Sequence, residues 1–104
     1  MISVFKGNYK YNEKDVKLYA PDRQGVYYIG GWAADGFILI EYIGKAIGEG
    51  VSIKTKLLDH LSNNELKKLS HFAFRIITTE KEIEECEKSE IKVYSPRYNT
   101  HNNG

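Results

Sequence analysis

Two tyrosines stand in neighbouring segments rich in strand-forming residues, Tyr27 in residues 25–30 and Tyr42 in residues 37–43. If these segments pair as adjacent antiparallel strands, the two phenols can lie together on one face of the sheet. Tyrosine is also a common strand residue whose hydroxyl reaches water, so a purely structural role stays open.

A lysine and a histidine form a second pair, Lys56 and His60, in a segment that reads as a helix over residues 53–61. Residues four apart are neighbours on a helix surface. The pair lies on the shoulder of an apolar stripe made by Ile53, Leu57 and Leu61. Its two side chains could face a phosphate held against the sheet. The alternative is an ordinary solvated helix edge.

Two glutamates, Glu87 and Glu90, fall on the same helical face as an apolar stripe near the C-terminus; that stripe is Ile83, Cys86, Ile91 and Tyr94. Glu84, Glu85, Lys88 and Lys92 are expected to point elsewhere. A carboxylate beside a core is costly unless it is paired or binds a metal. Mg²⁺ is commonly held by one or two carboxylates with water and phosphate. The alternative is a poorly buried helix whose glutamates reach solvent, and the pattern alone does not choose between Glu87 and Glu90.

The elements that would position these residues begin with a helix between residues 9 and 20. Asn12 is its expected N-cap, and Pro21 ends it. Strands follow at residues 25–30 and 37–43, joined as a hairpin by a loop at residues 31–36 and followed by a second glycine-rich stretch at residues 44–50.

The C-terminal half predicts a helix, a strand and a second helix. Ser52 caps the helix at residues 53–61, and a polar segment at residues 62–70 forms a loop or a short helix. Alternating residues predict a strand at residues 71–78, with Phe72, Phe74 and Ile76 on one face and His71, Ala73 and Arg75 on the other. Thr79 and Pro96 delimit a helix over residues 80–94.

Composition limits the class of protein. The 104 residues suit one domain, and no apolar run approaches the roughly 20 residues of a membrane span. Cys86 is the only cysteine, so neither an intrachain disulfide nor a cysteine zinc site is expected, and with no signal-peptide pattern the expected location is the cytoplasm. The net charge of +1 argues against a tight stand-alone binder of nucleic acid.

An ordered set of motifs resembles the GIY-YIG nuclease superfamily over about residues 21–99. Gly25-Val26-Tyr27 is similar to its first signature and Tyr42-Ile43-Gly44-Lys45 to its second. The basic residue and histidine of the following helix, a glutamate of the last helix and a closing Pro96-Arg97-Tyr98-Asn99 complete the set. The resemblance implies a single α/β (α+β) domain, a small three-stranded, mainly antiparallel sheet flanked by helices in the order (α)ββαβα.

The resemblance also implies an activity, hydrolysis of nucleic-acid phosphodiester bonds with one Mg²⁺ or Mn²⁺ held by Glu87. Tyr27, assisted by Tyr42 or water, would be a general base or would orient the attacking water; as a base it needs a lowered pKa, for which the metal and Lys56 offer positive charge. Lys56 would stabilise charge on the phosphate, His60 would orient or shuttle a proton, and Asn99 would be a polar orienting group.

One departure from the family pattern concerns the helix residue that is typically arginine and is Lys56 here. Lysine keeps the charge but lacks the planar fork that matches a phosphate. Lys54 is the alternative for this role, and Arg75 could compensate if its face of the sheet is open. Lys45, Lys54 and Arg75 are expected to contact nucleic acid, with DNA as the first candidate. A protein partner could supply target selection, and a binding or interaction module that has lost efficient cleavage is the rival interpretation.

Overall fold

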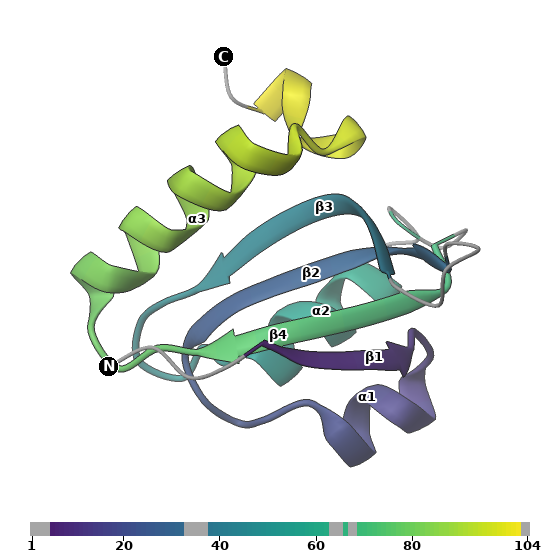
Figure 1. Ribbon diagram of the computed structural model, residues 1–104. Helices are drawn as coiled ribbons and strands as arrows, with labels where there is room; N and C mark the ends of the chain where they lie inside the picture. Colours follow the sequence, from purple (N-terminus) through teal and green to yellow (C-terminus); the bar gives the residue numbers. More distant parts are fainter. Residues whose placement is uncertain (1–4, 33–37, 63–65, 67–68, 103–104) are drawn as a thin grey trace.

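The computed structural model describes residues 5–32, 38–62, 66 and 69–102 (Figure 1). Within these ranges the protein is a small α+β fold with a four-stranded antiparallel sheet. The strands are β1 (Lys6–Lys10), β2 (Gly25–Trp32), β3 (Ile38–Ala46) and β4 (His71–Ile76). The helices are α1 (Glu13–Tyr19), α2 (Ile53–Ser62), α3 (Glu80–Tyr94) and a final 3₁₀ helix, η1 (Arg97–Asn102).

The sheet lies between two helical layers, and its strand order is β1-β4-β2-β3 (Figure 1). One face packs against α1 and α2, around buried side chains such as Tyr27, Phe72 and Leu57. The opposite face packs against α3, where Tyr28 and Ile83 are buried. Side chains of consecutive strand residues therefore enter different cores, as the alternation of a strand requires.

The N-terminal segment adds a strand that the sequence did not predict, so the expected three-stranded sheet was wrong and the sheet has four strands. Residues 6–10 form β1, which pairs antiparallel with β4 through Tyr9 opposite Phe72. The rings of Tyr9 and Phe72 lie 5.4 Å apart between centroids, so packing against a distant strand determines this conformation. The helix predicted within residues 9–20 begins at Glu13, directly after the predicted N-cap Asn12, whose side chain accepts the N–H of Asp15 at 2.8 Å.

The β2–β3 hairpin is longer than predicted at both of its described ends. Residues 31 and 32, expected in a loop, extend β2, and residues 44–46, expected in a glycine-rich loop, extend β3. Residues 33–36 of the expected first loop and the expected start of the second strand at Phe37 lie outside the described residues. The added length keeps glycines within the paired register, with Gly44 opposite Tyr27.

The C-terminal half agrees closely with the sequence patterns. Ser52 caps α2 by accepting the N–H of Thr55 at 3.1 Å, and Thr79 caps α3 by accepting the N–H of Glu82 at 3.3 Å. α3 has the predicted bounds, α2 is one residue longer, and β4 ends at Ile76 where a strand to residue 78 was predicted. Of the expected segment at residues 62–70, residues 63–65, 67 and 68 lie outside the described ranges. Among the helices in the described ranges, none has the length and apolar character needed to cross a bilayer.

Candidate active site

The side chain of Tyr27 passes over Gly44 of β3, a residue that has no side chain of its own. Its Cα lies opposite that of Gly44 in the β2–β3 register, and its side chain is only 1% exposed. A Cβ built on Gly44 would come within 2.3 Å of both the Cζ atom and the hydroxyl oxygen of Tyr27. The glycine therefore leaves the space that the phenol occupies.

Tyr27, Tyr42 and His60 form one cluster between the sheet and α2. The Tyr27 hydroxyl and His60 Nε2 are 2.8 Å apart and share a hydrogen bond whose direction depends on the histidine tautomer. The Tyr42 ring lies 6.2 Å from the Tyr27 ring and 5.2 Å from the His60 ring, measured between centroids. The structure thus places both phenols on one face of the sheet beside an imidazole.

The environment of Tyr27 keeps its phenol protonated. Burial is the largest cause of a raised pKa, and Tyr42, Tyr11 and Glu87 raise it further. This direction is opposite to the lowered pKa expected of a tyrosine acting alone as a base. A hydrogen-bonded neighbour such as His60 can instead accept the phenol proton when the hydroxyl receives one.

Lys56 lies one turn before His60 on α2, so the two share a side of the helix. The Lys56 side chain is half-buried, whereas Ile53 and Leu57 on the same helix are buried in the core. Lys54 lies two residues earlier and therefore faces a different direction around the helix. The helix geometry favours Lys56 over Lys54 as the lysine that accompanies His60.

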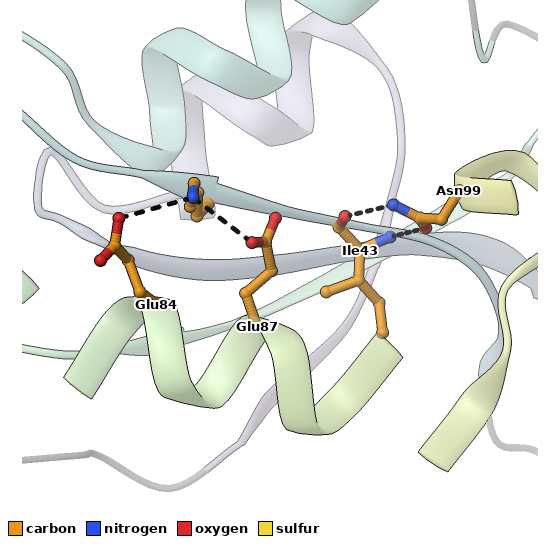
Figure 2. A network of polar contacts seen from close by, with 5 residues as sticks. Ile43, Glu84, Glu87 and Asn99 are labelled. Carbon is orange, nitrogen blue, oxygen red and sulfur yellow. Dashed lines mark hydrogen bonds and ion pairs between the residues drawn. The ribbon is translucent and has the colours of Figure 1, made fainter. Parts of the chain in front are cut away.

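Glu87 reaches from α3 toward β3 (Figure 2). One of its carboxylate oxygens lies 3.6 Å from the Nζ atom of Lys45, and a carboxylate oxygen of Glu84 lies 3.7 Å from the same Nζ. Glu84 is exposed, as expected of a residue off the apolar stripe, but its carboxylate still reaches the same lysine as Glu87. Residues three apart on a helix are neighbours, so the spacing from Glu87 was the signal that could have identified Glu84.

A hard divalent ion is compatible with this donor set. Glu87 is largely shielded, with 18% of its side chain exposed, while the Glu84 side chain is 56% exposed. Within the described ranges, no group of three or more His, Cys, Asp or Glu side chains could hold a metal. One or two carboxylates suit an ion that takes its remaining ligands from water and phosphate.

Asn99 is buried and its amide is fully engaged with the backbone of β3 (Figure 2). Its Oδ1 accepts the N–H of Ile43 at 2.8 Å, and its Nδ2 donates to the carbonyl of Ile43 at 2.9 Å. Ile43 lies between Tyr42 and Gly44, so Asn99 positions the strand that carries the site. The expected role of Asn99 as a polar orienting group stays a prediction; the structure shows its amide bonded to the backbone of Ile43.

Arg75 and Glu90 belong to the opposite face of the sheet. Tyr28 donates a hydrogen bond to Glu90 at 2.6 Å and accepts one from Arg75 Nε at 3.1 Å, and Arg75 lies 3.7 Å from Glu90. The two glutamates that the sequence left as alternatives therefore have different neighbours: Glu90 pairs with Tyr28 and Arg75, whereas Glu87 reaches Lys45 of β3 and is close enough to Tyr27 to raise its pKa. Arg75 cannot compensate for a missing arginine beside His60 from this face.

A cleft of about 540 Å³ lies between α1 and α2 and is lined by Glu13, Lys17, Leu58, Asp59, Leu61 and Ser62. None of the candidate residues lines it. A polymer with exposed phosphates can bind an open surface, so the polar cluster around Tyr27 is the better candidate for chemistry. Comparison with protein-family models, curated proteins and solved structures finds nothing that matches this chain, and its function must be argued from this cluster.

Proposed function

We propose that this protein is a divalent-metal-dependent endonuclease of the GIY-YIG type, acting on nucleic-acid phosphodiester bonds. The observation that carries the proposal is the hydrogen bond between Tyr27 and His60, beside Tyr42. The chain brings a phenol, an imidazole and a second phenol together, and Glu87 is close enough to influence the Tyr27 pKa. Gly44, in the second signature, supports the proposal because it accommodates the Tyr27 ring.

The hydrogen bond suggests how the chain handles protons during hydrolysis. With Nε2 of His60 unprotonated, Tyr27 donates its proton to the imidazole while its oxygen receives a proton from the attacking water. The water oxygen bonds to phosphorus, the bond between phosphorus and the leaving sugar oxygen breaks, and that oxygen takes a proton from solvent. The raised pKa of Tyr27 disfavours a phenolate intermediate. The transfer from water to Tyr27 and the transfer from Tyr27 to His60 would therefore occur in one step.

Charge neutralisation would come from Lys56 and from the ion held by Glu87, with Glu84 beside it. When bound there, Mg²⁺ or Mn²⁺ supplies Lewis-acid stabilisation of a phosphate oxygen and the leaving oxygen. The Lys56 ammonium provides a second positive charge on the side of α2, one turn from His60. The substrate phosphate would lie between α2 and the edge of β3.

A plasmid-nicking assay tests this proposal directly. Supercoiled plasmid is incubated with the protein and Mg²⁺ or Mn²⁺, with EDTA as the metal-free control, and nicked product is quantified. We expect metal-dependent nicking that Glu87→Gln abolishes with little loss of stability, because the near-isosteric amide cannot replace the charge. Glu90→Gln is the matched control and keeps the metal dependence, since Glu90 faces Tyr28. Activity of Glu87→Gln together with inactivity of Glu90→Gln would contradict the assignment.

A binding or interaction module without efficient cleavage is the second candidate. Two observations favour it: Tyr27 is 1% exposed, and Lys45 already neutralises Glu87. Such a module, alone or with a protein partner that selects the target, would shift a labelled oligonucleotide in a gel without cutting it. Metal-independent binding with no nicking in Mg²⁺ or Mn²⁺ would select this candidate over the nuclease.

A further inference from the structure

Lys45 occupies an unusual position for a residue expected to contact nucleic acid. It follows Gly44 on β3, and its ammonium lies within 3.7 Å of carboxylate oxygens from two successive turns of α3. The lysine side chain is 41% exposed, so water can reach the ammonium and it can leave without disturbing the core. Lys45 is therefore a partly exposed cation in contact with the carboxylates that would bind the metal.

The charges explain what the lysine does in the absence of a metal. Glu84 and Glu87 are like charges on one helix face, and their repulsion disfavours α3. The Lys45 ammonium offsets that repulsion, as a divalent ion would. An ammonium and a metal ion repel each other, so both are not held at full strength by the same two carboxylates.

We propose that Lys45 is a built-in competitor of the divalent ion, an inference that rests on the proposed function. It neutralises Glu84 and Glu87 in the metal-free protein and swings away when the ion binds. Lys45 thereby sets the metal affinity of the site, and metal binding releases a positive charge beside the expected path of the substrate. In this structure the Lys45 ammonium contacts the carboxylates of Glu84 and Glu87. It becomes available to bind a phosphate only after a metal ion has taken its place.

The test measures Mn²⁺ binding without nucleic acid, from the electron paramagnetic resonance signal of free Mn²⁺ during titration. An exposed charge pair is typically worth a factor of about 1.4 to 5 in an equilibrium constant. Loss of two competing pairs should therefore tighten Mn²⁺ binding on the order of tenfold in Lys45→Met, and Lys45→Gln should behave likewise. Lys88→Met is the matched control, because Lys88 is exposed, follows Glu87 in sequence and forms no ion pair among the described residues.

The outcomes separate this inference from the proposed function. Tighter binding in both Lys45 variants, with Lys88→Met near the parent protein and Glu87→Gln unable to bind, supports the competitor. Unchanged or weaker binding in the Lys45 variants, while Glu87→Gln still abolishes binding, overturns the competitor and leaves the metal site in place. Mn²⁺ binding that does not depend on Glu87 in any variant overturns the metal site itself.

Discussion

Gly44 is required for its lack of a side chain and not for an unusual backbone angle. It lies within β3, and the phenol of Tyr27 fills the space above it. The sequence suggested a glycine-rich loop here because glycine usually weakens a strand. The tertiary contact with Tyr27 gives the glycine a different role, which no local pattern reveals.

Replacing Gly44 with alanine should destabilise the protein and displace Tyr27. The added Cβ would meet the Tyr27 ring and hydroxyl at 2.3 Å. Overpacking of this kind costs about 1–3 kcal/mol in the free energy of unfolding, measurable by urea denaturation. Gly31→Ala is the control, because a Cβ there meets nothing within 4 Å. Equal stability of the two variants would mean that Tyr27 can move at little cost.

The proposed contact of Lys56 with the substrate phosphate can be tested by replacing the lysine with arginine or with alanine. Lys56→Arg should keep or raise the cleavage rate, because a guanidinium can meet two phosphate oxygens at once. Lys56→Ala should lower it on the order of a hundredfold or more, the equivalent of about 2.7–4 kcal/mol of lost transition-state stabilisation. Single-turnover cleavage of a labelled duplex provides the measurement. An alanine variant as fast as the parent would make Lys56 a solvated helix residue.

The helix α3 shows which features were predictable from sequence. Its ends follow from nearby residues: Thr79 caps the start, and Ser95 in the left-handed conformation, followed by Pro96, ends it. β1 was not predictable, because its residues pair only with β4, which lies more than 60 residues later in the chain. The faces of α3 were predicted in part. The apolar stripe is confirmed for Ile83, Cys86 and Ile91, whereas Tyr94 is exposed. The position of Lys45 is what brings Glu84 and Glu87 to one cation.

The two core tyrosines of β2, Tyr27 and Tyr28, should make the folded protein less stable at alkaline pH. In the unfolded chain, tyrosine titrates near its ordinary pKa of about 10. Burial is the main cause of a raised pKa for Tyr27 and for Tyr28, and the carboxylate of Glu90 adds to it for Tyr28. The folded protein keeps phenol protons that the unfolded chain loses, so stability is fully present below about pH 10 and falls above it.

Urea unfolding at pH 8 and pH 11 measures this effect. We expect a lower free energy of unfolding at pH 11, and a smaller difference between the two pH values in Tyr28→Phe, which removes one of the two phenols. Tyr28→Phe should also be less stable at pH 8, because Glu90 loses its 2.6 Å hydrogen bond. The same loss between pH 8 and pH 11 in parent and variant would show that Tyr28 is not responsible.

The candidate site forms only when the chain is folded, because its residues come from separate elements. His60 and Lys56 come from α2 on one face of the sheet, whereas Glu84 and Glu87 come from α3 on the other. The two groups approach each other around β3, which is an outer strand of the sheet. The sequence could therefore indicate the residue types, while their separation into two faces, including the remote place of Arg75 and Glu90, required the strand register.

Asn99 tests how strongly the C-terminal residues hold β3 in place. Asn99→Ala should lower the free energy of unfolding by about 1–3 kcal/mol, because it removes two hydrogen bonds to buried backbone groups. Asn99→Asp should be destabilising as well, since a carboxylate can accept the Ile43 N–H but faces the Ile43 carbonyl with no hydrogen to donate. Chemical denaturation of both variants is the measurement. An alanine variant as stable as the parent would show that Ile43 is satisfied by other groups.

The amide of Asn99 also does for β3 what another strand would do. An outer strand with unpaired N–H and C=O groups is a template on which a second molecule can add its own strand, and long pairings of this kind lead to fibrils. Asn99 occupies both groups of Ile43, and Arg97 holds η1 against the same strand through a 2.8 Å contact with Glu41. A chain shortened before Arg97 would leave the backbone groups of the edge strand β3 unpaired. We expect such a chain to self-associate at high protein concentration.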